Sequence, residues 1–340
     1  FPNFSFSKLI DKKNDLKGNL DYTISGSNIK KDTNTDEKFL INDLNYTSNS
    51  FFSKIGTISN FNLLFRNAVK EGNKSDKYQD ETESDNYGNL IFSSSLPLSK
   101  KKGNYVSGLI PKLSARFSPN KSENLKNLDR NINTTNIFSN NRLGLSDSLE
   151  GGQSMTLGLD YNLRDFNDQN LLTASLAQIY RDINDDRLPI SSKMTTKSSD
   201  IVGNISIFPS NENFNLNYNF SADNNLDTIN YNKVETSFKV NNFITSFEFL
   251  EENNDFGSDS YLLTDVSYAL NNNRITYNTR RNRKTDLTEF YNIIYEYKND
   301  CLVAAIEYNK DYYQDRDLKP SEEIFFSLTI TPFSSINSPN

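Results

Sequence analysis

The stretch that decides the fold is residues 213–220, with the sequence NFNLNYNF. Large apolar side chains and asparagines alternate strictly through it, so an extended chain would have one apolar and one polar face. The same period of two recurs at 234–240, 243–249 and 324–330. Helical spacing is sustained nowhere in the sequence. The pattern predicts an all-β fold.

The expected strands are long. We expect about seventeen of them, many of roughly 9–11 residues, the length at which a tilted strand crosses a bilayer. Strands of soluble proteins are shorter, near 5–6 residues on average, about half this length. The apolar rows seldom carry a charge, and one lysine or arginine at mid-bilayer costs about 2–4 kcal/mol. The sequence therefore predicts that residues 1–340 form part of an antiparallel transmembrane β-barrel of the outer-membrane type.

Connection lengths between the expected strands alternate. If the last strand, near 322–333, ends in the periplasm, the periplasmic turns are short and fall near 98–103, 164–169, 209–212, 241–242, 270–272 and 298–301. The outside loops are mostly longer and fall near 71–86, 119–153, 182–199, 222–232, 251–259, 281–286 and 311–321. Outer-membrane barrels have short periplasmic turns and longer outside loops. The alternation favours a sheet that spans a membrane.

The composition argues against several classes of function. The net charge is −7, whereas nucleic-acid binding needs clustered lysine and arginine. Histidine is absent and cysteine occurs once, which removes the commonest general base and any Cys/His zinc set. We expect no catalytic residue, no enzyme activity, no metal, no cofactor and no nucleic-acid partner.

Two stretches go beyond a generic barrel pattern. Residues 137–161, IFSNNRLGLSDSLEGGQSMTLGLDY, contain an Asn-Arg pair, a glycine followed by an aspartate, and Glu-Gly-Gly before a strand. Residues 297–333, YKNDCLVAAIEYNKDYYQDRDLKPSEEIFFSLTITPF, contain an Asn-Asp-Cys turn, an Asp-x-x-Pro-Ser loop and a closing Pro-Phe. Both stretches resemble the LptD family of lipopolysaccharide-assembly proteins, in which they lie in the barrel. In the first, Leu145 and Ser146 separate Gly144 from Asp147, where the family pattern has one residue.

The resemblance implies an outer-membrane translocon located in the cell outer membrane. In this family a periplasmic Lpt bridge delivers lipopolysaccharide to an N-terminal jellyroll domain. The barrel opens laterally between its first and last strands and inserts the lipid into the outer leaflet, and an LptE-like lipoprotein plugs the lumen. Residues 1–340 would then be the C-terminal part of such a barrel, without the jellyroll and the early strands, and 322–333 would border the lateral seam.

Cys301 is the only cysteine. The strand count places it at a periplasmic turn, in an oxidising compartment. The resemblance implies a disulfide from this turn to the N-terminal periplasmic region. The alternative is an unpaired thiol.

A basic cluster lies in an expected outside loop and comprises Arg280, Arg281, Arg283 and Lys284. Arginine forks match phosphate oxygens, so the cluster is a candidate contact for lipid A or core phosphates. The alternative is an ordinary solvated hairpin loop.

The longest loop contains the resembling residues Arg142, Asp147, Glu150, Gly151 and Gly152. One hypothesis has this loop folded inward, with its charged side chains forming lumenal salt bridges near the sugar path. The other gives them a structural role that holds the loop against the wall, and we favour this one. The two glycines would permit a tight turn into the next strand.

Two other classes of protein remain as alternatives. A porin or small-solute receptor would share the barrel but needs neither the 137–161 stretch nor the Asp300-Cys301 turn. A secreted β-rich adhesin would be a water-soluble monomer without alternating loop lengths.

Overall fold

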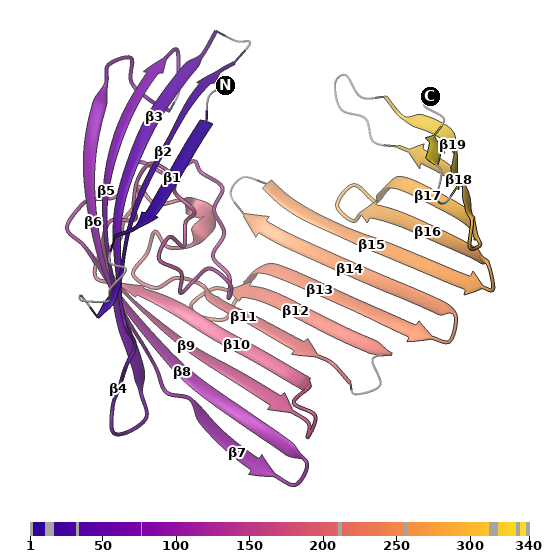
Figure 1. Ribbon diagram of the computed structural model, residues 1–340, viewed down its shortest axis with the longest axis horizontal. Coiled ribbons are helices and arrows are strands. Elements are labelled where there is room, and N and C mark those ends of the chain that lie inside the picture. Colours follow the sequence, from indigo (N-terminus) through magenta and orange to yellow (C-terminus); the bar gives the residue numbers. More distant parts are fainter. Residues whose placement is uncertain are drawn as a thin grey trace. The chain divides into compact units, whose positions relative to one another are not determined.

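A computed structural model describes residues 3–10, 17–31, 34–75, 77–209, 213–254, 257–312, 319–330 and 334–337. In these ranges the regular structure is β-strand, apart from the short 3-10 helix Ile190–Ser192 (Figure 1). The predicted all-β fold is confirmed. No helix in the described part of the chain is long and apolar enough to cross a membrane. The closing Pro-Phe at 332–333 lies outside the described residues.

The chain forms two compact units. Unit 1 comprises Phe1–Lys102, Val106–Tyr161 and Ser175–Gly203, and unit 2 comprises Gly103–Tyr105, Asn162–Ala174 and Asn204–Asn340. The strands of unit 1 are β1 (Asn3–Leu9), β2 (Gly18–Lys30), β3 (Asp36–Ser48), β4 (Phe51–Phe52), β5 (Ile58–Asn73), β6 (Glu83–Ser95), β7 (Leu98–Lys102) and most of β8 (Tyr105–Ser118). Residues of both units occur in β9 (Gly152–Arg164), β10 (Asn170–Arg181) and β11 (Ile201–Ile207).

Unit 2 continues with a run of neighbouring strands. They are β12 (Phe214–Ala222), β13 (Ile229–Val240), β14 (Phe243–Asn254), β15 (Gly257–Leu270), β16 (Asn273–Asn282), β17 (Leu287–Lys298), β18 (Leu302–Asp311), β19 (Ser321–Ile330) and β20 (Ser334–Asn337). Each pairs antiparallel with the next. In unit 1 the antiparallel pairs are β1–β2, β2–β3, β3–β5, β4–β5, β5–β6 and β6–β8.

Strand lengths agree with the prediction. Of the 20 strands in the described ranges, only β4, β7 and β20 have five residues or fewer. The other strands have 7 to 16 residues, and most are long enough to cross a bilayer at a tilt.

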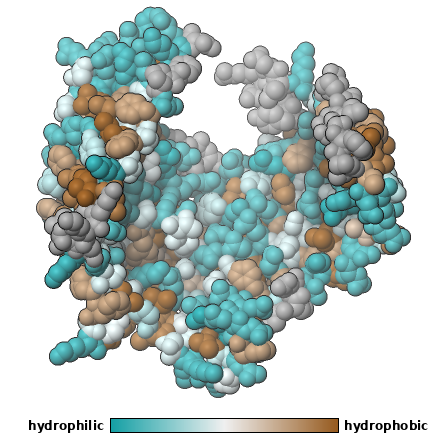
Figure 2. All heavy atoms as spheres, in the orientation of Figure 1, coloured by the Kyte–Doolittle hydropathy of each residue, from teal (hydrophilic) through white to brown (hydrophobic). Residues whose placement is uncertain are grey.

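The strands of unit 1 expose their apolar face and bury their polar face. On β5, Leu63 and Phe65 are 44% and 52% exposed, whereas Asn62 and Arg66 are 5% and 8% exposed. Hydrophobic residues accordingly gather along the left flank of Figure 2, over β5 and β6. This is the reverse of a water-soluble sheet, whose apolar face is covered, and it suits strands that face lipid.

The polar face of unit 2 carries a ladder of side-chain hydrogen bonds. Asn217 accepts a bond from Asn204 at 2.7 Å and donates one to Glu235 at 2.9 Å. Farther along the sheet, Asn292 on β17 donates to Glu307 on β18 at 2.6 Å. Amides and carboxylates thus satisfy one another across strands on the face opposite the apolar row.

The predicted loop lengths are accurate for the two longest loops of unit 1, but the loop predicted at 71–86 and loops of unit 2 are shorter than expected. The turn predicted at 98–103 is mostly strand β7. The unit 1 connections at 119–151 and 182–200 are long, as expected. In unit 2, however, the expected loop at 251–259 is largely strand, because β14 runs to Asn254 and pairs with β15 from Gly257. The hydrophobic alternation ends at 250, but backbone pairing continues through polar residues beyond it. The end of an apolar row therefore does not mark the end of a strand.

Candidate functional site

The two long connections of unit 1, residues 119–151 and 182–200, fold together over the polar face of its strands (Figure 1). We call them the capping loops. Their small apolar core contains Leu125, Ile132, Ile137, Leu143, Leu145, Leu188 and Met194 from the loops, and Ala177, Ile179 and Val202 from the strands. The backbone N–H of Leu125 also donates to the carbonyl oxygen of Arg187 at 2.7 Å. The loops are thus a folded, ordered cover.

Glu150 is the charged centre of the contact between loop and strands. Its carboxylate accepts hydrogen bonds from Arg142 Nε at 2.7 Å and from Arg181 Nη1 at 2.6 Å. Arg116 Nε lies 4.0 Å from the same carboxylate. All four side chains are buried. Since Arg116 lies on β8 and Arg181 ends β10, this one carboxylate connects the loop to two strands.

Arg142 also connects the loop to β9, which follows β8 and precedes β10 in the chain. Its Nη1 donates to Thr156 Oγ1 at 3.1 Å and its Nη2 to Ser154 Oγ at 2.9 Å, both on β9. A bidentate guanidinium–carboxylate pair with further hydrogen bonds is the arrangement in which buried charges are well compensated. We name Arg116, Arg142, Glu150 and Arg181 the arginine anchor.

The anchor sets the ionisation of Glu150. Burial alone would raise the pKa of this carboxyl, but Arg142, Arg116 and Arg181 outweigh burial and lower the pKa from 4.5 to about 2. The carboxylate is therefore ionised at every physiological pH.

Acid should loosen the capping loops through Glu150. A carboxyl whose pKa is lower in the folded state stabilises that state fully above its ordinary pKa, and loses this contribution as the pH falls through the folded value. We expect pepsin cleavage of residues 119–151 to increase between about pH 4.5 and about pH 2. The Glu150→Gln protein should lack this part of the acid response. An identical acid profile in both proteins would contradict the assignment.

Gly151 and Gly152 are required by close backbone contacts. A Cβ on Gly151 would overlap the backbone of Asn120 and Ser122. Gly152 has a φ of +81°, and a Cβ there would lie 3.0 Å from Arg181 Nη2. The carbonyl oxygen of Gly151 accepts a bond from Arg181 at 2.8 Å. The pair thus lets the chain enter β9 directly beside the anchor.

Asp147 belongs to a second contact, separate from the anchor. Its Oδ2 accepts hydrogen bonds from Tyr78 at 2.5 Å and from Lys77 at 2.7 Å, both in the 74–82 connection. Burial would raise the pKa of Asp147, but the hydrogen bonds from Lys77 and Tyr78 lower it overall. The structure therefore brings Arg142 and Glu150 together and places Asp147 in a different cluster.

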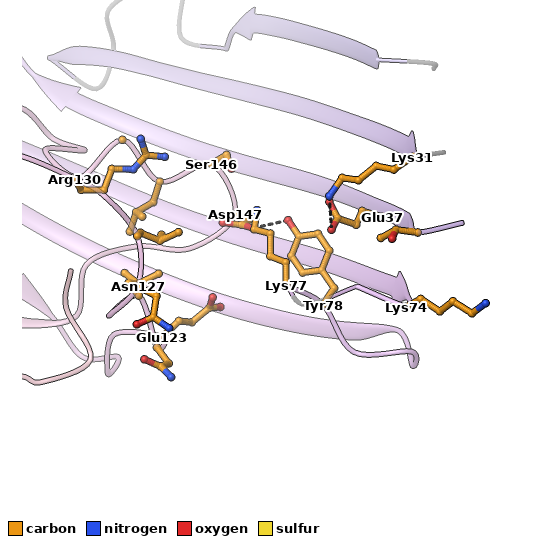
Figure 3. Close-up of a pocket in the computed structure, with 16 residues that line it drawn as sticks. Lys31, Glu37, Lys74, Lys77, Tyr78, Glu123, Asn127, Arg130, Ser146 and Asp147 are labelled. Atoms are coloured by element: carbon orange, nitrogen blue, oxygen red, sulfur yellow. Dashed lines mark hydrogen bonds and ion pairs between the residues drawn. The ribbon is translucent and has the colours of Figure 1, made fainter. Parts of the chain in front are cut away.

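A polar pocket of about 670 Å³ adjoins Asp147 (Figure 3). Tyr78 points toward Asp147, Lys31 pairs with Glu37 at 3.3 Å, and Lys74 points away from both. Lysine, glutamate and asparagine side chains share the lining. Within the described ranges, no group of three or more Cys, Asp or Glu side chains is arranged to hold a metal ion.

Several residues that hold the loops could not be identified from the sequence. Arg66 on β5 donates to the carbonyl oxygens of Leu145 and Ser148 at 3.1 and 3.0 Å, and Arg116 to those of Ser139 and Asn140, both at 2.9 Å. Each arginine stands alone in its strand sequence. The only sequence signal is its place in the polar row of the strand, which does not show that it contacts a loop.

A family model described as LPS transport system D, LptD, matches residues 65–275, which is more than half of the chain. The chain belongs to the LptD family. The matched region includes the 119–151 and 182–200 loops and the whole arginine anchor. It ends before the basic cluster at 280–284 and before Cys301. Membership of the LptD family places this β-barrel chain in the cell outer membrane and confirms the predicted resemblance.

Solved structures with similar coordinates include a siderophore receptor and a porin. The siderophore receptor PirA from Acinetobacter baumannii is 9% identical with a TM-score of 0.46, over 98% of this chain and 64% of the receptor. A mutant Rh. blastica porin is 9% identical with a TM-score of 0.30, over 91% of this chain and 92% of the porin. This chain thus spans less than two thirds of the receptor's length. No curated protein sequence matches it. Because both TM-scores are below 0.5, the assignment rests on the LptD family match.

The basic cluster of this LptD-family chain lies at the β16–β17 hairpin, and two of its members are paired with carboxylates. Arg280 Nε lies 3.0 Å from Glu289, and Arg281 Nη2 lies 2.5 Å from Asp286. Arg283 stacks over the Phe249 ring at 5.0 Å. Lys284 lies in the hairpin turn. Binding of lipopolysaccharide phosphate by this cluster remains a prediction.

Cys301 is an exposed free thiol at a tight turn of the LptD-family barrel. The side-chain oxygen of Asn299 accepts hydrogen bonds from the backbone N–H groups of Cys301 and Leu302, at 2.9 and 2.8 Å. The Asn-Asp-Cys sequence therefore forms an asparagine-led turn that presents the thiol between β17 and β18.

Proposed function

We propose that the chain is a barrel region of a lipopolysaccharide translocon, which inserts lipopolysaccharide into the outer leaflet without covalent chemistry. The observation that carries the proposal is the LptD family match, which includes both capping loops. The arginine anchor supports it, because a wide barrel needs a firmly held cover if it is not to leak solutes. Arg142, Glu150, Gly151 and Gly152 then hold the cover against the wall, and Asp147 joins it to the neighbouring connection.

The proposal includes partners on both sides of the membrane. Lipopolysaccharide is the substrate, an LptE-like lipoprotein plugs the lumen, and a periplasmic Lpt bridge delivers the lipid through an N-terminal jellyroll domain. Arg283 and Lys284 are the members of the basic cluster that we propose as phosphate contacts, since carboxylates already pair with Arg280 and Arg281.

A depletion experiment tests this function. Cells that depend on a repressible copy of the full-length protein should lose newly made lipopolysaccharide from their surface, measured by labelling intact cells. Re-expression of the full-length protein should restore it. Unchanged surface lipopolysaccharide together with slower uptake of a small solute would contradict the proposal and indicate a porin or solute receptor.

Substitution of Cys301 tests the proposed disulfide to the N-terminal region. The full-length protein should change its mobility between non-reducing and reducing electrophoresis, and Cys301→Ser should abolish or alter that change, because the exposed thiol is then lost. Thr285→Cys in the Cys301→Ser protein is the matched control, because Thr285 is exposed in the turn at the opposite end of β17, and it should not restore the mobility change. The same mobility change in wild type and Cys301→Ser would exclude Cys301 from the disulfide.

A further inference from the structure

The connection between β3 and β5 is a protruding hairpin with an apolar tip. It contains β4 and projects at the lower end of unit 1 (Figure 1). Phe51, Phe52 and Ile55 are 49%, 73% and 77% exposed. Burial of such large apolar side chains away from water is favourable. Exposing three of them together on a hairpin predicts contact with another apolar phase.

The hairpin is held in one shape. The backbone N–H of Ser53 donates to Thr57 O at 3.0 Å, and that of Gly56 donates to Ser53 O at 3.0 Å. Ser53 Oγ also accepts a bond from the N–H of Thr57 at 3.1 Å. Gly56 has a φ of +89°, which the turn requires. The exposed side chains are therefore presented by an ordered turn.

The tip continues the apolar outer surface of the strands. The rings of Phe51 and Phe92 lie 6.4 Å apart, and Phe92 belongs to the exposed apolar row of β6. On the other side of the turn, a Cβ on Gly56 would lie 3.9 Å from the side chain of Leu96. Since the outer surface of the strands faces lipid in an outer-membrane barrel, the hairpin extends that surface toward one leaflet boundary.

Lysines accompany the apolar tip. Lys54 is exposed within the turn, and Lys100, Lys101 and Lys102 are exposed on β7, which follows Leu96 in the chain. Both connections, 49–57 and 96–104, lie at the same ends of the antiparallel strands as the turn near 164–169, which the alternation of loop lengths assigns to the periplasm. Aromatic and basic side chains at the same end of the strands are typical of a membrane–water interface, where rings enter the leaflet and ammonium groups contact phosphates.

We propose that the β4 hairpin and β7 form a docking surface for anionic phospholipid of the periplasmic leaflet. Phe51, Phe52 and Ile55 enter the acyl region, and Lys54 and Lys100–Lys102 contact the headgroup phosphates. This surface goes beyond lipopolysaccharide transport: it fixes the depth of the barrel wall in the leaflet opposite the one that receives lipopolysaccharide. Lipid is the occupant that the surface fits, because the tip is continuous with the lipid-facing row and carries cations.

Fluorescence in proteoliposomes tests the apolar contact. This chain has no tryptophan, so Phe52→Trp adds one reporter, measured as the difference from the unsubstituted full-length protein. In vesicles of phosphatidylethanolamine and phosphatidylglycerol, brominated acyl chains should quench this signal and acrylamide should not. Lys197→Trp, on an exposed part of a capping loop, is the control and should show the opposite. If the Phe52→Trp protein does not show the heat-dependent electrophoretic mobility of a folded barrel, the Ile55→Trp protein is used as the reporter instead.

Charge substitutions test the headgroup contact. Quenching of Phe52→Trp should be stronger when the bromine is on phosphatidylglycerol than when it is on phosphatidylethanolamine. The triple substitution Lys100→Gln, Lys101→Gln and Lys102→Gln should move the ratio of these two quenching extents toward one. Quenching by acrylamide would show a water-exposed hairpin, and quenching by neither reagent would show a protein-covered one. Either result would overturn the proposal. Equal quenching by the two brominated lipids in the protein with all its lysines would overturn it as well. These outcomes are independent of lipopolysaccharide transport.

Discussion

Glu150→Gln is expected to release the capping loops from the wall and to make cells permeable to large antibiotics. The substitution leaves Arg116, Arg142 and Arg181 buried together without their carboxylate. Breaking a buried ion pair on one side typically costs about 3–5 kcal/mol. At about 1.4 kcal/mol for each tenfold change, hydrogen exchange in residues 137–150 should rise by roughly two to three and a half orders of magnitude in the membrane-embedded protein.

The matched control for Glu150→Gln is Asp186→Asn. Asp186 is exposed in the same pair of loops, so its substitution makes the same change of charge without affecting the anchor. A second test uses Arg142→Gln, which removes one of the repelling guanidiniums. The double variant Arg142→Gln/Glu150→Gln should be less destabilised than the sum of the single variants. Strictly additive effects, or unchanged exchange in Glu150→Gln, would show that the anchor does not hold the loops.

The strands could be predicted from the sequence because their cause is local. Alternation such as that at 213–220 is a property of neighbouring residues, and β12 begins at Phe214 as the pattern requires. Loop lengths were predictable only where the loop was much longer than a turn, as at 119–151. At 251–254 pairing with the next strand continues past the apolar row, and pairing is not visible in a single strand's sequence.

The site was predictable only on its loop side. The 137–161 stretch identified Arg142 and Glu150, but their partners Arg116 and Arg181 are isolated residues in strands β8 and β10. Their convergence depends on strand register and on the path of a 33-residue connection. The local sequence determines neither of these. Asp147 could be placed in the right loop but not in the right cluster. Its partners, Lys77 and Tyr78, come from a different connection.

Gly158→Leu is expected to displace the same loop by a different route, through packing instead of charge. A Cβ at Gly158 would lie 2.6 and 2.8 Å from ring carbons of Phe138, which packs against the capping-loop core. The ring therefore lies directly on the backbone of β9, and a larger residue must push it away. Overpacking of this kind costs about 1–3 kcal/mol, so hydrogen exchange around 137–145 should rise about 5–150-fold.

Rescue distinguishes this packing contact from a general defect of β9. Phe138→Ala alone should destabilise the loop, because it removes the ring from the core, whereas Phe138→Ala in the Gly158→Leu protein should restore part of the lost protection. Met155→Leu, on the exposed apolar face of the same strand, should leave exchange in the loop unchanged. If the double variant were worse than both single variants, the ring would not be what the added side chain displaces. The anchor would then be the main attachment of the loop to β9.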